Sequence, residues 1–214
     1  MGYNSFYVRY IKRLLDVAIG LGVMGTLWPV MLLMSAAIYA EDPGPVLFRQ
    51  ERIGKDGKAF TMLKFRTMKQ NVEHTGSGVY SGEDDPRVLK TGRIFRKTSA
   101  DELIQAVHLI NGEMSLIGPR PPLTYHPWPI EEYDEEQLHM FDVRPGLTGW
   151  AQINGRKGVE WHKRIEMNVW YTRNVSFKLD WEIFLKTFSK VFSSEDNVNT
   201  GATLQTGSEG AGSC

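Results

Sequence analysis

Two adjacent carboxylates, Asp101 and Glu102, are the residues of this sequence best suited to chemistry. Adjacent acids at the start of a helix usually cap it and complement its dipole, which is the simpler interpretation. Arg93, Arg96 and Lys97, however, closely precede the pair. Neighbouring carboxylates can share one Mg²⁺, which keeps its waters and bridges substrate phosphates, while basic side chains neutralise phosphate oxygens. The cluster therefore predicts a site for a phosphorylated anion and a divalent cation.

Other catalytic chemistries are disfavoured. Two neighbouring acids in a helix diverge by about 100°, whereas a glycosidase needs them on opposite sides of the scissile bond. The sequence has no GxxxxGK[ST], HExxH or GxSxG motif, which argues against a P-loop, a zinc-hydrolase or a serine-hydrolase site. Its one cysteine, Cys214, excludes a disulfide framework and a cysteine-ligated metal. The formal net charge of zero argues against a general nucleic-acid-binding protein.

A long apolar segment, Val17 to Ala40, contains no charged residue over 24 positions. As one helix it would reach about 36 Å, enough to cross a hydrocarbon core of about 30 Å. Pro29 would kink it into halves of about 18 Å, too short to span. Basic residues flank both ends, which favours both flanks on the cytoplasmic side. The residues leave two alternatives open: a kinked spanning helix, or a re-entrant helix that breaks at Pro29 and returns to the same face.

Two other interpretations of this segment are weaker. A signal peptide would be shorter and would end at a small-residue cleavage site, which the sequence lacks before Glu41. Gly20 to Gly25 matches GxGxxG, but a dinucleotide-binding fold needs an intact helix after the glycines and a second parallel strand. Small residues within a membrane helix explain the glycines more simply.

Strand-like alternation before the carboxylates predicts a β-hairpin. Val46–Ile53 and Phe60–Met68 are the two runs, and an Asp-Gly turn lies between them. Because side chains alternate along a strand, Lys64 and Arg66 are expected to project from one face of this sheet. The hairpin would therefore present two cations together.

The residues around the carboxylates predict a helix. Leu103–Leu109 is expected to be amphipathic, with Ser99 as its N-cap and Glu102 completing a capping box. Residues 70–83 are polar and are expected to form a loop. Asp84 and Asp85 are interpreted as a turn or a cap rather than as a metal-binding pair.

Later segments divide the remaining chain. Ile130–His139 is predicted to be an acidic, exposed helix, and an apolar stripe from Trp181 to Phe192 follows helical spacing. This stripe could pack into the core or lie on a lipid surface. The expected division is a membrane helix with its flank at 1–42, a catalytic domain at 43–192 and a flexible tail at 193–214.

Five ordered motifs resemble those of the bacterial sugar transferases, the monotopic polyprenyl-phosphate phosphoglycosyl transferases. The similarity extends over roughly residues 8 to 192. The motifs are Lys64-Phe65-Arg66-Thr67-Met68, Asp85-Pro86-Arg87, the run from Arg96 to Leu103, Gly118-Pro119-Arg120-Pro121, and the run from Arg144 to Arg156.

The resemblance implies a reaction. Family members transfer a sugar 1-phosphate from a UDP-sugar to a polyprenol phosphate, usually undecaprenol phosphate, and release UMP. In this chain Asp101 would be the nucleophile that forms a covalent aspartyl-phosphosugar intermediate. Glu102 would orient the site or bind Mg²⁺, and both carboxylates would be metal ligands. The product begins a glycoconjugate such as O-antigen, capsule, exopolysaccharide or a glycoprotein glycan.

The resemblance also implies the positions of other site residues. The expected phosphate contacts are Lys64, Arg66, Arg96, Arg120 and Pro121. The segment that contains Arg144, Gln152 and Arg156 is expected to shape the mouth of the site or contact the nucleotide. Pro29 would be the break of a re-entrant membrane helix.

The expected architecture is mixed α/β, with a re-entrant helix-break-helix, a short antiparallel hairpin and several amphipathic interfacial helices. We expect the protein at the bacterial inner membrane with its active site on the cytoplasmic face. The expected partners are the UDP-sugar, the polyprenyl phosphate and membrane lipid, with a homodimer or downstream glycosyltransferases as further possibilities and no nucleic acid.

The chain departs from the family pattern at Trp28, Ile104 and Asn168, where members usually have Ser, Pro and Asp. Ile104 should leave the carboxylates intact, because a proline early in a helix is helpful but not chemical. Two rival functions remain: a catalytically inactive, membrane-anchored scaffold of a polysaccharide assembly complex, and an enzyme of another class such as a lipid phosphatase.

Overall fold

The computed structural model describes residues 2–70, 72, 85–155 and 159–193, and only the backbone of 190–193. Arg156, Asp84, most of the expected loop at 70–83 and the tail beyond residue 193 lie outside the described residues.

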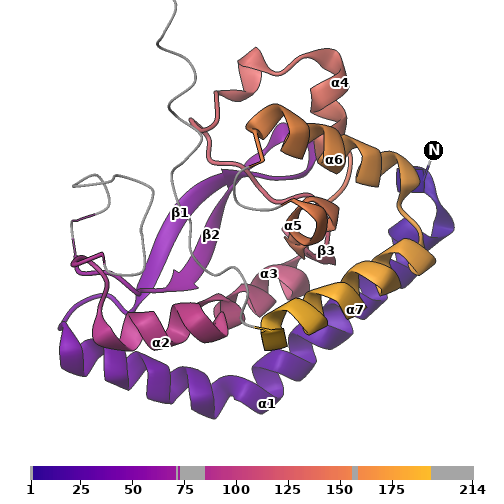
Figure 1. The fold of residues 1–214 in the computed structure, drawn as a ribbon. Helices are drawn as coiled ribbons and strands as arrows, with labels where there is room; N and C mark the ends of the chain where they lie inside the picture. Colours follow the sequence, from indigo (N-terminus) through magenta and orange to yellow (C-terminus); the bar gives the residue numbers. More distant parts are fainter. Residues whose placement is uncertain (1, 71, 73–84, 156–158, 194–214) are drawn as a thin grey trace, which may run out of the picture.

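Helices dominate the described chain, and the strands form two small sheets (Figure 1). The α-helices are α1 (Lys12–Glu41), α2 (Lys90–Thr98), α3 (Ala106–Asn111), α4 (Glu135–Leu138), α5 (Trp150–Asn154), α6 (Trp161–Asn174) and α7 (Phe177–Ser193). Short helical turns are η1 (Gly2–Asn4), η2 (Tyr7–Ile11), η3 (Lys55–Gly57), η4 (Ala100–Gln105), η5 (Ile130–Glu132) and η6 (His139–Phe141). The strands are β1 (Leu47–Ile53), β2 (Ala59–Phe65), β3 (Ser115–Ile117) and β4 (Gly146–Thr148).

The apolar N-terminal segment forms one long helix, α1, rather than two helices separated at Pro29. Figure 1 shows that α1 changes direction part-way along its length. The expectation of helix, break and helix is therefore corrected to a bent, continuous helix. A proline removes only one backbone donor, so the neighbouring turns can continue around it. With η2, the helix is long and apolar enough to cross a membrane.

Helix α1 packs along α3, and a glycine allows the close approach. A Cβ added at Gly20 would lie 2.8 Å from Cγ1 of Ile110 and 2.9 Å from the carbonyl oxygen of Ala106. Nearer the C-terminal end of α1, Met34 and Ile38 pack with Phe65 of β2. The β-hairpin therefore rests directly on the apolar helix.

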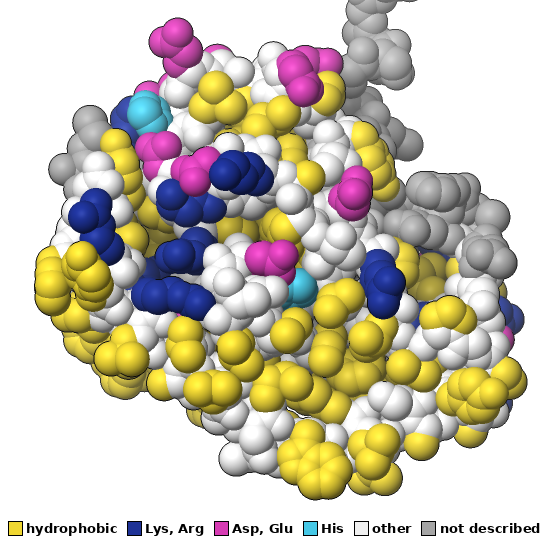
Figure 2. All heavy atoms as spheres, turned by 180° about the vertical axis from the view of Figure 1, so that it is seen from behind, with side chains coloured by type: hydrophobic (Ala, Val, Ile, Leu, Met, Phe, Trp, Pro, Cys, Tyr) yellow, Lys and Arg dark blue, Asp and Glu magenta, His cyan; other side chains and the backbone are white. Residues whose placement is uncertain are grey.

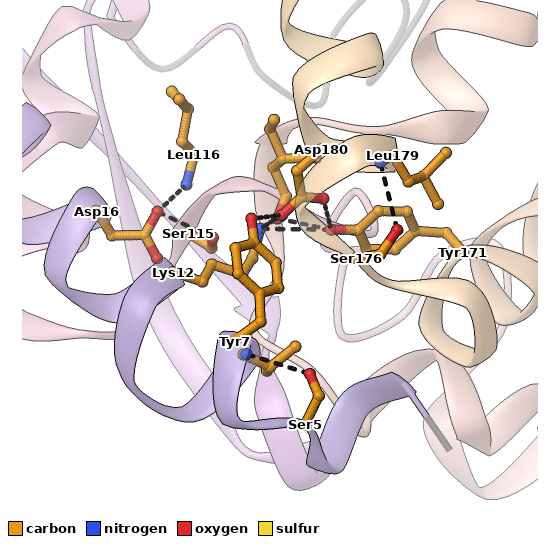
Figure 3. A network of polar contacts seen from close by, with 12 residues as sticks. Ser5, Tyr7, Lys12, Asp16, Ser115, Leu116, Tyr171, Ser176, Leu179 and Asp180 are labelled. Atoms are coloured by element: carbon orange, nitrogen blue, oxygen red, sulfur yellow. Dashed lines mark hydrogen bonds and ion pairs between the residues drawn. The ribbon is translucent and has the colours of Figure 1, made fainter.

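A buried polar network joins the N-terminal end of α1 to α7 (Figure 3). The Lys12 ammonium forms an ion pair with Asp180, and both side chains are about nine-tenths buried. The hydroxyls of Tyr7 and Tyr171 each donate to the Asp180 carboxylate at 2.6 Å. Asp16, one turn after Lys12, accepts from the Leu116 amide at 2.8 Å. The network fixes α1 to the domain that follows it.

The predicted hairpin is confirmed. Strands β1 and β2 pair antiparallel with Arg49 opposite Leu63, and η3 supplies the turn. Asp56 and Gly57 take left-handed backbone angles, with φ of 58° and 71°, a conformation that suits an Asp-Gly turn. The second sheet, in which β3 and β4 pair in parallel, is not among the predicted elements.

The expected capping box at Ser99 is wrong. Ser99 has φ 55° and ends α2, and its side chain makes no capping hydrogen bond. Its carbonyl oxygen accepts from the Glu102 amide at 3.2 Å. The predicted Leu103–Leu109 helix begins instead as η4, which contains both carboxylates, and continues as α3.

Two other local predictions have mixed outcomes. The expected turn at Asp85 is confirmed, because its Oδ1 accepts from the Arg87 amide at 2.9 Å. The acidic helix expected at Ile130–His139 is divided into η5, α4 and η6. A capping box does occur there, where Asp134 and Gln137 cap α4.

Helix α7 combines both interpretations of its apolar stripe. Leu179 and Ile183 are buried in the core with Tyr171. Trp181 and Phe188, by contrast, are more than half exposed. One face of α7 therefore packs inward, and the other presents aromatic side chains to the surroundings.

Candidate active site

The two carboxylates lie on η4, which packs against β2 of the hairpin. The Lys64 ammonium on β2 donates to Oε1 of Glu102 at 2.6 Å. Their side chains keep 21% and 33% of their surface exposed, respectively. This pair is therefore accessible, and it joins the hairpin to the carboxylates.

The surroundings shift the pKa values of the two carboxylates in opposite directions. Burial raises the pKa of Asp101 to about 6, and the charge of Glu102 adds to this rise, while Lys64 and Arg96 oppose it. Burial also acts to raise the pKa of Glu102, but Lys64, Arg120 and Arg52 outweigh it and lower that pKa below its usual value. At neutral pH both carboxylates are ionised, and Asp101 is the more basic of the two.

Arg96 reaches this site because α2 approaches the end of β2 closely. Its Nε donates to Oγ1 of Thr67 at 2.8 Å, and its charge acts on Asp101. A Cβ at Gly92 would lie only 2.2 Å from the carbonyl oxygen of Thr67. A glycine at this position therefore sets the distance at which Arg96 stands.

Arg66 occupies a different setting from Lys64. Its Nη1 donates to Oδ2 of Asp42 at 2.8 Å, Nη2 donates to the Asp42 backbone oxygen, and the residue is buried. The guanidinium therefore joins the end of β2 to the residue that ends α1. Its predicted role as a phosphate contact stays a prediction.

The segment around Arg120 is fixed against the loop that follows Arg144. The Gly118 amide donates to the Thr148 oxygen at 2.8 Å, and the Gly146 amide donates to the Pro119 oxygen at 2.9 Å. Arg120 itself is exposed and acts electrostatically on Glu102. The two predicted motifs therefore lie together, beside the carboxylates.

Gln152 follows this loop and keeps an unusual feature. Both polar atoms of its side-chain amide are buried without a hydrogen-bond partner in the described part of the chain. Its Oε1 lies near Gly149, where an added Cβ would be 3.0 Å away. A buried amide of this kind has unused hydrogen-bonding capacity. Its expected part in shaping the mouth of the site or contacting the nucleotide stays a prediction.

Arg144 caps a helix. Its Nε donates to the carbonyl oxygen of Gly112 at 2.8 Å, at the end of α3. Arg13 donates to the carbonyls of Leu109 and Ile110 in the same turn. The Arg144 side chain therefore stabilises the helix that continues from the carboxylates. Its contact with the nucleotide stays a prediction.

Comparisons with known proteins identify the family. A sequence model described as "Bacterial sugar transferase" matches residues 7–194. The chain belongs to the bacterial sugar transferase family. The uncharacterized sugar transferase EpsL of Bacillus subtilis (strain 168) is 40% identical over 185 residues, which cover 86% of this chain and 89% of EpsL.

Two further relatives of this sugar transferase have named activities. The UDP-glucose:undecaprenyl-phosphate glucose-1-phosphate transferase of Escherichia coli (strain K12) is 37% identical over 86% of this chain. The UDP-N-acetylgalactosamine-undecaprenyl-phosphate N-acetylgalactosaminephosphotransferase of Aeromonas hydrophila is 35% identical over 85% of it. The aligned parts are only 40% and 44% of those two proteins.

The structure of this sugar transferase adds residues that sequence reasoning missed. Arg52 on β1 donates to the Pro121 oxygen at 3.0 Å and acts electrostatically on Glu102. Gln105 on η4 is 2% exposed, and its Nε2 has no partner among the described residues. The alternation of β1 could have shown that Arg52 and Gln50 share a face, but nothing local indicates that β1 lies beside the Arg120 loop.

The carboxylate pair offers oxygen donors to a divalent cation. No group of three or more His, Cys, Asp or Glu side chains that could hold a metal occurs in the described ranges. Mg²⁺ does not require such a cage, since it commonly takes one or two carboxylates together with water and substrate phosphate. Asp101 and Glu102 are adjacent, half-buried and rich in oxygen, so this sugar transferase has a donor set that fits.

Proposed function

We propose that this sugar transferase moves a sugar 1-phosphate from a UDP-sugar to a polyprenyl phosphate such as undecaprenyl phosphate. The named relatives in Escherichia coli and Aeromonas hydrophila support the substrate classes. The observation that carries the proposal is the half-buried Asp101, which has a raised pKa and stands within electrostatic reach of Lys64, Glu102 and Arg96. A scaffold would have no need to combine these groups.

In the first step, a carboxylate oxygen of Asp101 attacks the β-phosphorus of the UDP-sugar. The bond from that phosphorus to the bridging oxygen breaks, and UMP leaves with the oxygen and its electron pair. The sugar phosphate then remains on Asp101 as an acyl phosphate. With a pKa of about 6, the carboxylate is ionised at neutral pH and needs no base.

In the second step, an oxygen of the polyprenyl phosphate attacks the same phosphorus. The bond to Asp101 breaks, and its carboxylate is restored. Lys64, Arg96 and Arg120 would neutralise phosphate oxygens during both steps. Glu102 accepts a hydrogen bond from Lys64 at 2.6 Å and so keeps the Lys64 ammonium in place.

Mg²⁺ is proposed as the cofactor, with Asp101 and Glu102 as its protein ligands. When bound, it supplies positive charge to the diphosphate of the donor and so favours departure of UMP. Asp101 and Glu102 are in the first turn of η4, so this short helical turn holds the two carboxylates close together.

Membrane association follows from α1 and from the acceptor. The helix exposes large apolar side chains, among them Leu14, Leu32 and Leu33. Figure 2 shows Lys and Arg side chains gathered on one face of the molecule, beside a broad apolar surface. Such a combination suits an acceptor with a phosphate head and a hydrocarbon tail.

We propose that the bend in α1 makes the helix re-entrant, with both flanks at the cytoplasmic face of the bacterial inner membrane. The active site would then meet the lipid phosphate at the membrane surface. The product would be the first lipid-linked intermediate of a glycoconjugate. Downstream glycosyltransferases would take it up, and a homodimer is also proposed.

The test is a screen of UDP-sugars for release of UMP by the purified protein in detergent, with and without undecaprenyl phosphate and Mg²⁺. The proposal predicts lipid-linked product and stoichiometric UMP with at least one donor, both lost in EDTA. Glu131→Gln, which changes an exposed acid outside the site, is the control for substitutions of Asp101 and Glu102 and should keep the activity. Phosphate release without any UDP-sugar would indicate a lipid phosphatase, and the absence of turnover with every donor would favour a scaffold.

A further inference from the structure

A buried histidine lies on the helix that follows the carboxylate pair. His108 lies on α3, which continues directly from η4, and it is 3% exposed. Its ring contacts the Phe60 ring edge-on at 5.7 Å between centroids. The mechanism proposed above makes no use of this side chain, although it is polar and enclosed.

The Nε2 atom of His108 accepts a hydrogen bond from the backbone amide of Leu63 at 3.1 Å. Leu63 lies on β2, whose sheet has two strands. In an antiparallel pair, successive amides of a strand point alternately toward the partner and away from it. The Leu63 amide therefore points away from β1. His108 accepts its hydrogen bond at the open edge of β2, where a third strand would otherwise pair.

The contact also distinguishes the two ring nitrogens of His108. Because Nε2 accepts a hydrogen bond, the proton of the neutral imidazole must be on Nδ1. Nδ1 lies 2.6 Å from Oε2 of Glu113, to which it donates. The amide of Asn111 donates to the same Oε2 at 2.7 Å. Glu113 therefore orients the ring in the way that an outer carboxylate orients a metal-bound histidine.

The residue after Leu63 is Lys64, which holds Glu102 at 2.6 Å. These contacts and the chain form a closed loop. From Glu102 the chain continues through η4 and α3 to His108, whose ring accepts a hydrogen bond from the Leu63 amide. One peptide unit links Leu63 to Lys64, whose ammonium donates to Glu102. Each of the two noncovalent contacts in this loop, at Leu63 and at Glu102, limits the position of the other.

We infer that His108 is a positioning residue, which sets Lys64 against the carboxylate pair by holding the Leu63 amide at the open edge of β2. The inference rests on the proposed function for its kinetic consequence. Without the ring acceptor, the partly buried Leu63 amide loses its partner, and β2 can shift relative to η4. A displacement of this kind weakens catalysis more than substrate binding, because the reacting groups lose their alignment.

The experiment compares three variants of the full chain in detergent. His108→Leu removes the acceptor and puts an apolar side chain of similar bulk in its place. His108→Gln keeps an acceptor, since its Oε1 can reach the place of Nε2. Ile183→Ala is the control, because Ile183 on α7 is fully buried in a core cluster that contains no residue of β2.

The expected result is a separation of stability from rate. His108→Leu lowers kcat by about tenfold or more while KM for the UDP-sugar changes less. His108→Gln restores most of kcat. Ile183→Ala lowers Tm at least as much as His108→Leu but keeps kcat per folded molecule. In a Lys64→Met background, His108→Leu has little further effect, because the two residues act through one contact.

Hydrogen–deuterium exchange supplies a readout that needs no turnover. His108→Leu should accelerate exchange in the β2 segment, and His108→Gln and Ile183→Ala should do so far less. Unchanged exchange at β2 in His108→Leu, or equal losses of kcat in His108→Leu and Ile183→Ala, would overturn the inference. If the wild-type protein fails to turn over any UDP-sugar, the proposed function fails, and the exchange comparison still decides the contact.

Discussion

Lys64 and Glu102 are 38 positions apart in sequence, and their charged groups meet at 2.6 Å. The contact joins a β-hairpin to a short helical turn, and each element alone would leave its charge without a partner. It lowers the pKa of Glu102 against the effect of burial. The charge of Lys64 also limits the rise in the pKa of Asp101. One ammonium therefore influences both carboxylates.

Substitution of Lys64 should impair catalysis strongly. Lys64→Met is expected to lower kcat by about a hundredfold, because a charge that stabilises the transition state is removed. Lys64→Arg should keep part of the rate, since it keeps the charge but changes the geometry. Lys58→Met, at the exposed turn of the same hairpin, is the control and should leave kcat unchanged. Steady-state UMP release measures all three. Equal rates for Lys64→Met and the wild type would remove Lys64 from the site.

The raised pKa of Asp101 has a consequence for stability. Burial moves this pKa from 3.8 to about 6, so the folded state holds the proton more tightly than the unfolded state. The stability of the wild type should therefore fall as pH rises from about 4 to about 6. In EDTA above pH 6, Asp101→Asn is expected to be more stable by up to about 3 kcal/mol, since each pKa unit is worth about 1.4 kcal/mol.

Thermal unfolding at a series of pH values tests this expectation. The difference between Asp101→Asn and the wild type should vanish below pH 4, where the wild-type carboxyl is protonated in both states. A difference that stays constant across the pH range would show that the substitution acts through packing and not through the buried charge.

Gly92 sets the approach of α2 to the end of β2. Gly92→Ala should destabilise the protein by about 1–3 kcal/mol, because its Cβ would lie 2.2 Å from a backbone oxygen and something must shift. Gly22→Ala is the control: Gly22 is also helical, has open space around its Cβ position and should gain helix propensity. Thermal unfolding compares the two. Similar changes in Tm would mean that the close approach at Thr67 has no importance.

The buried pair of Lys12 and Asp180 should be costly to break. Lys12→Met leaves the Asp180 carboxylate buried without its cation, which is expected to cost about 3–5 kcal/mol. Lys163→Met, which breaks an exposed pair with Glu166, should cost less than about 1 kcal/mol. Limited proteolysis adds a local readout, since α1 should be released from α7 in Lys12→Met. Comparable stability of both variants would contradict a role for this pair in anchoring α1.

The parts of the fold that local patterns encode were predicted well. The hairpin follows from two alternating runs and an Asp-Gly turn, which all lie within a short stretch of sequence. The proximity of Lys64 and Arg96 to the carboxylates followed from the motifs and from the family resemblance. The capping box at Ser99 matched its pattern equally well, yet Ser99 takes a left-handed conformation and ends the preceding helix. A cap motif cannot show which of two neighbouring helices a residue serves.

Other features depend on contacts that no local pattern reveals. The parallel pairing of β3 with β4 involves strands of three residues each, too short for a recognisable alternation. Arg52 and His108 were missed because their importance comes from distant neighbours, the Pro121 carbonyl and the Leu63 amide. The bend in α1 could be anticipated from Pro29, whereas the continuity of the helix through it could not.

The central claim is that Asp101 becomes covalently bonded to the sugar phosphate. The most direct measurement uses a UDP-sugar labelled in its β-phosphate, incubated with the protein and Mg²⁺ without a lipid acceptor. The account predicts about one equivalent of acid-stable label on the protein, located at Asp101, released on addition of undecaprenyl phosphate and absent in Asp101→Asn. Labelled lipid product that persists undiminished in Asp101→Asn would contradict the account.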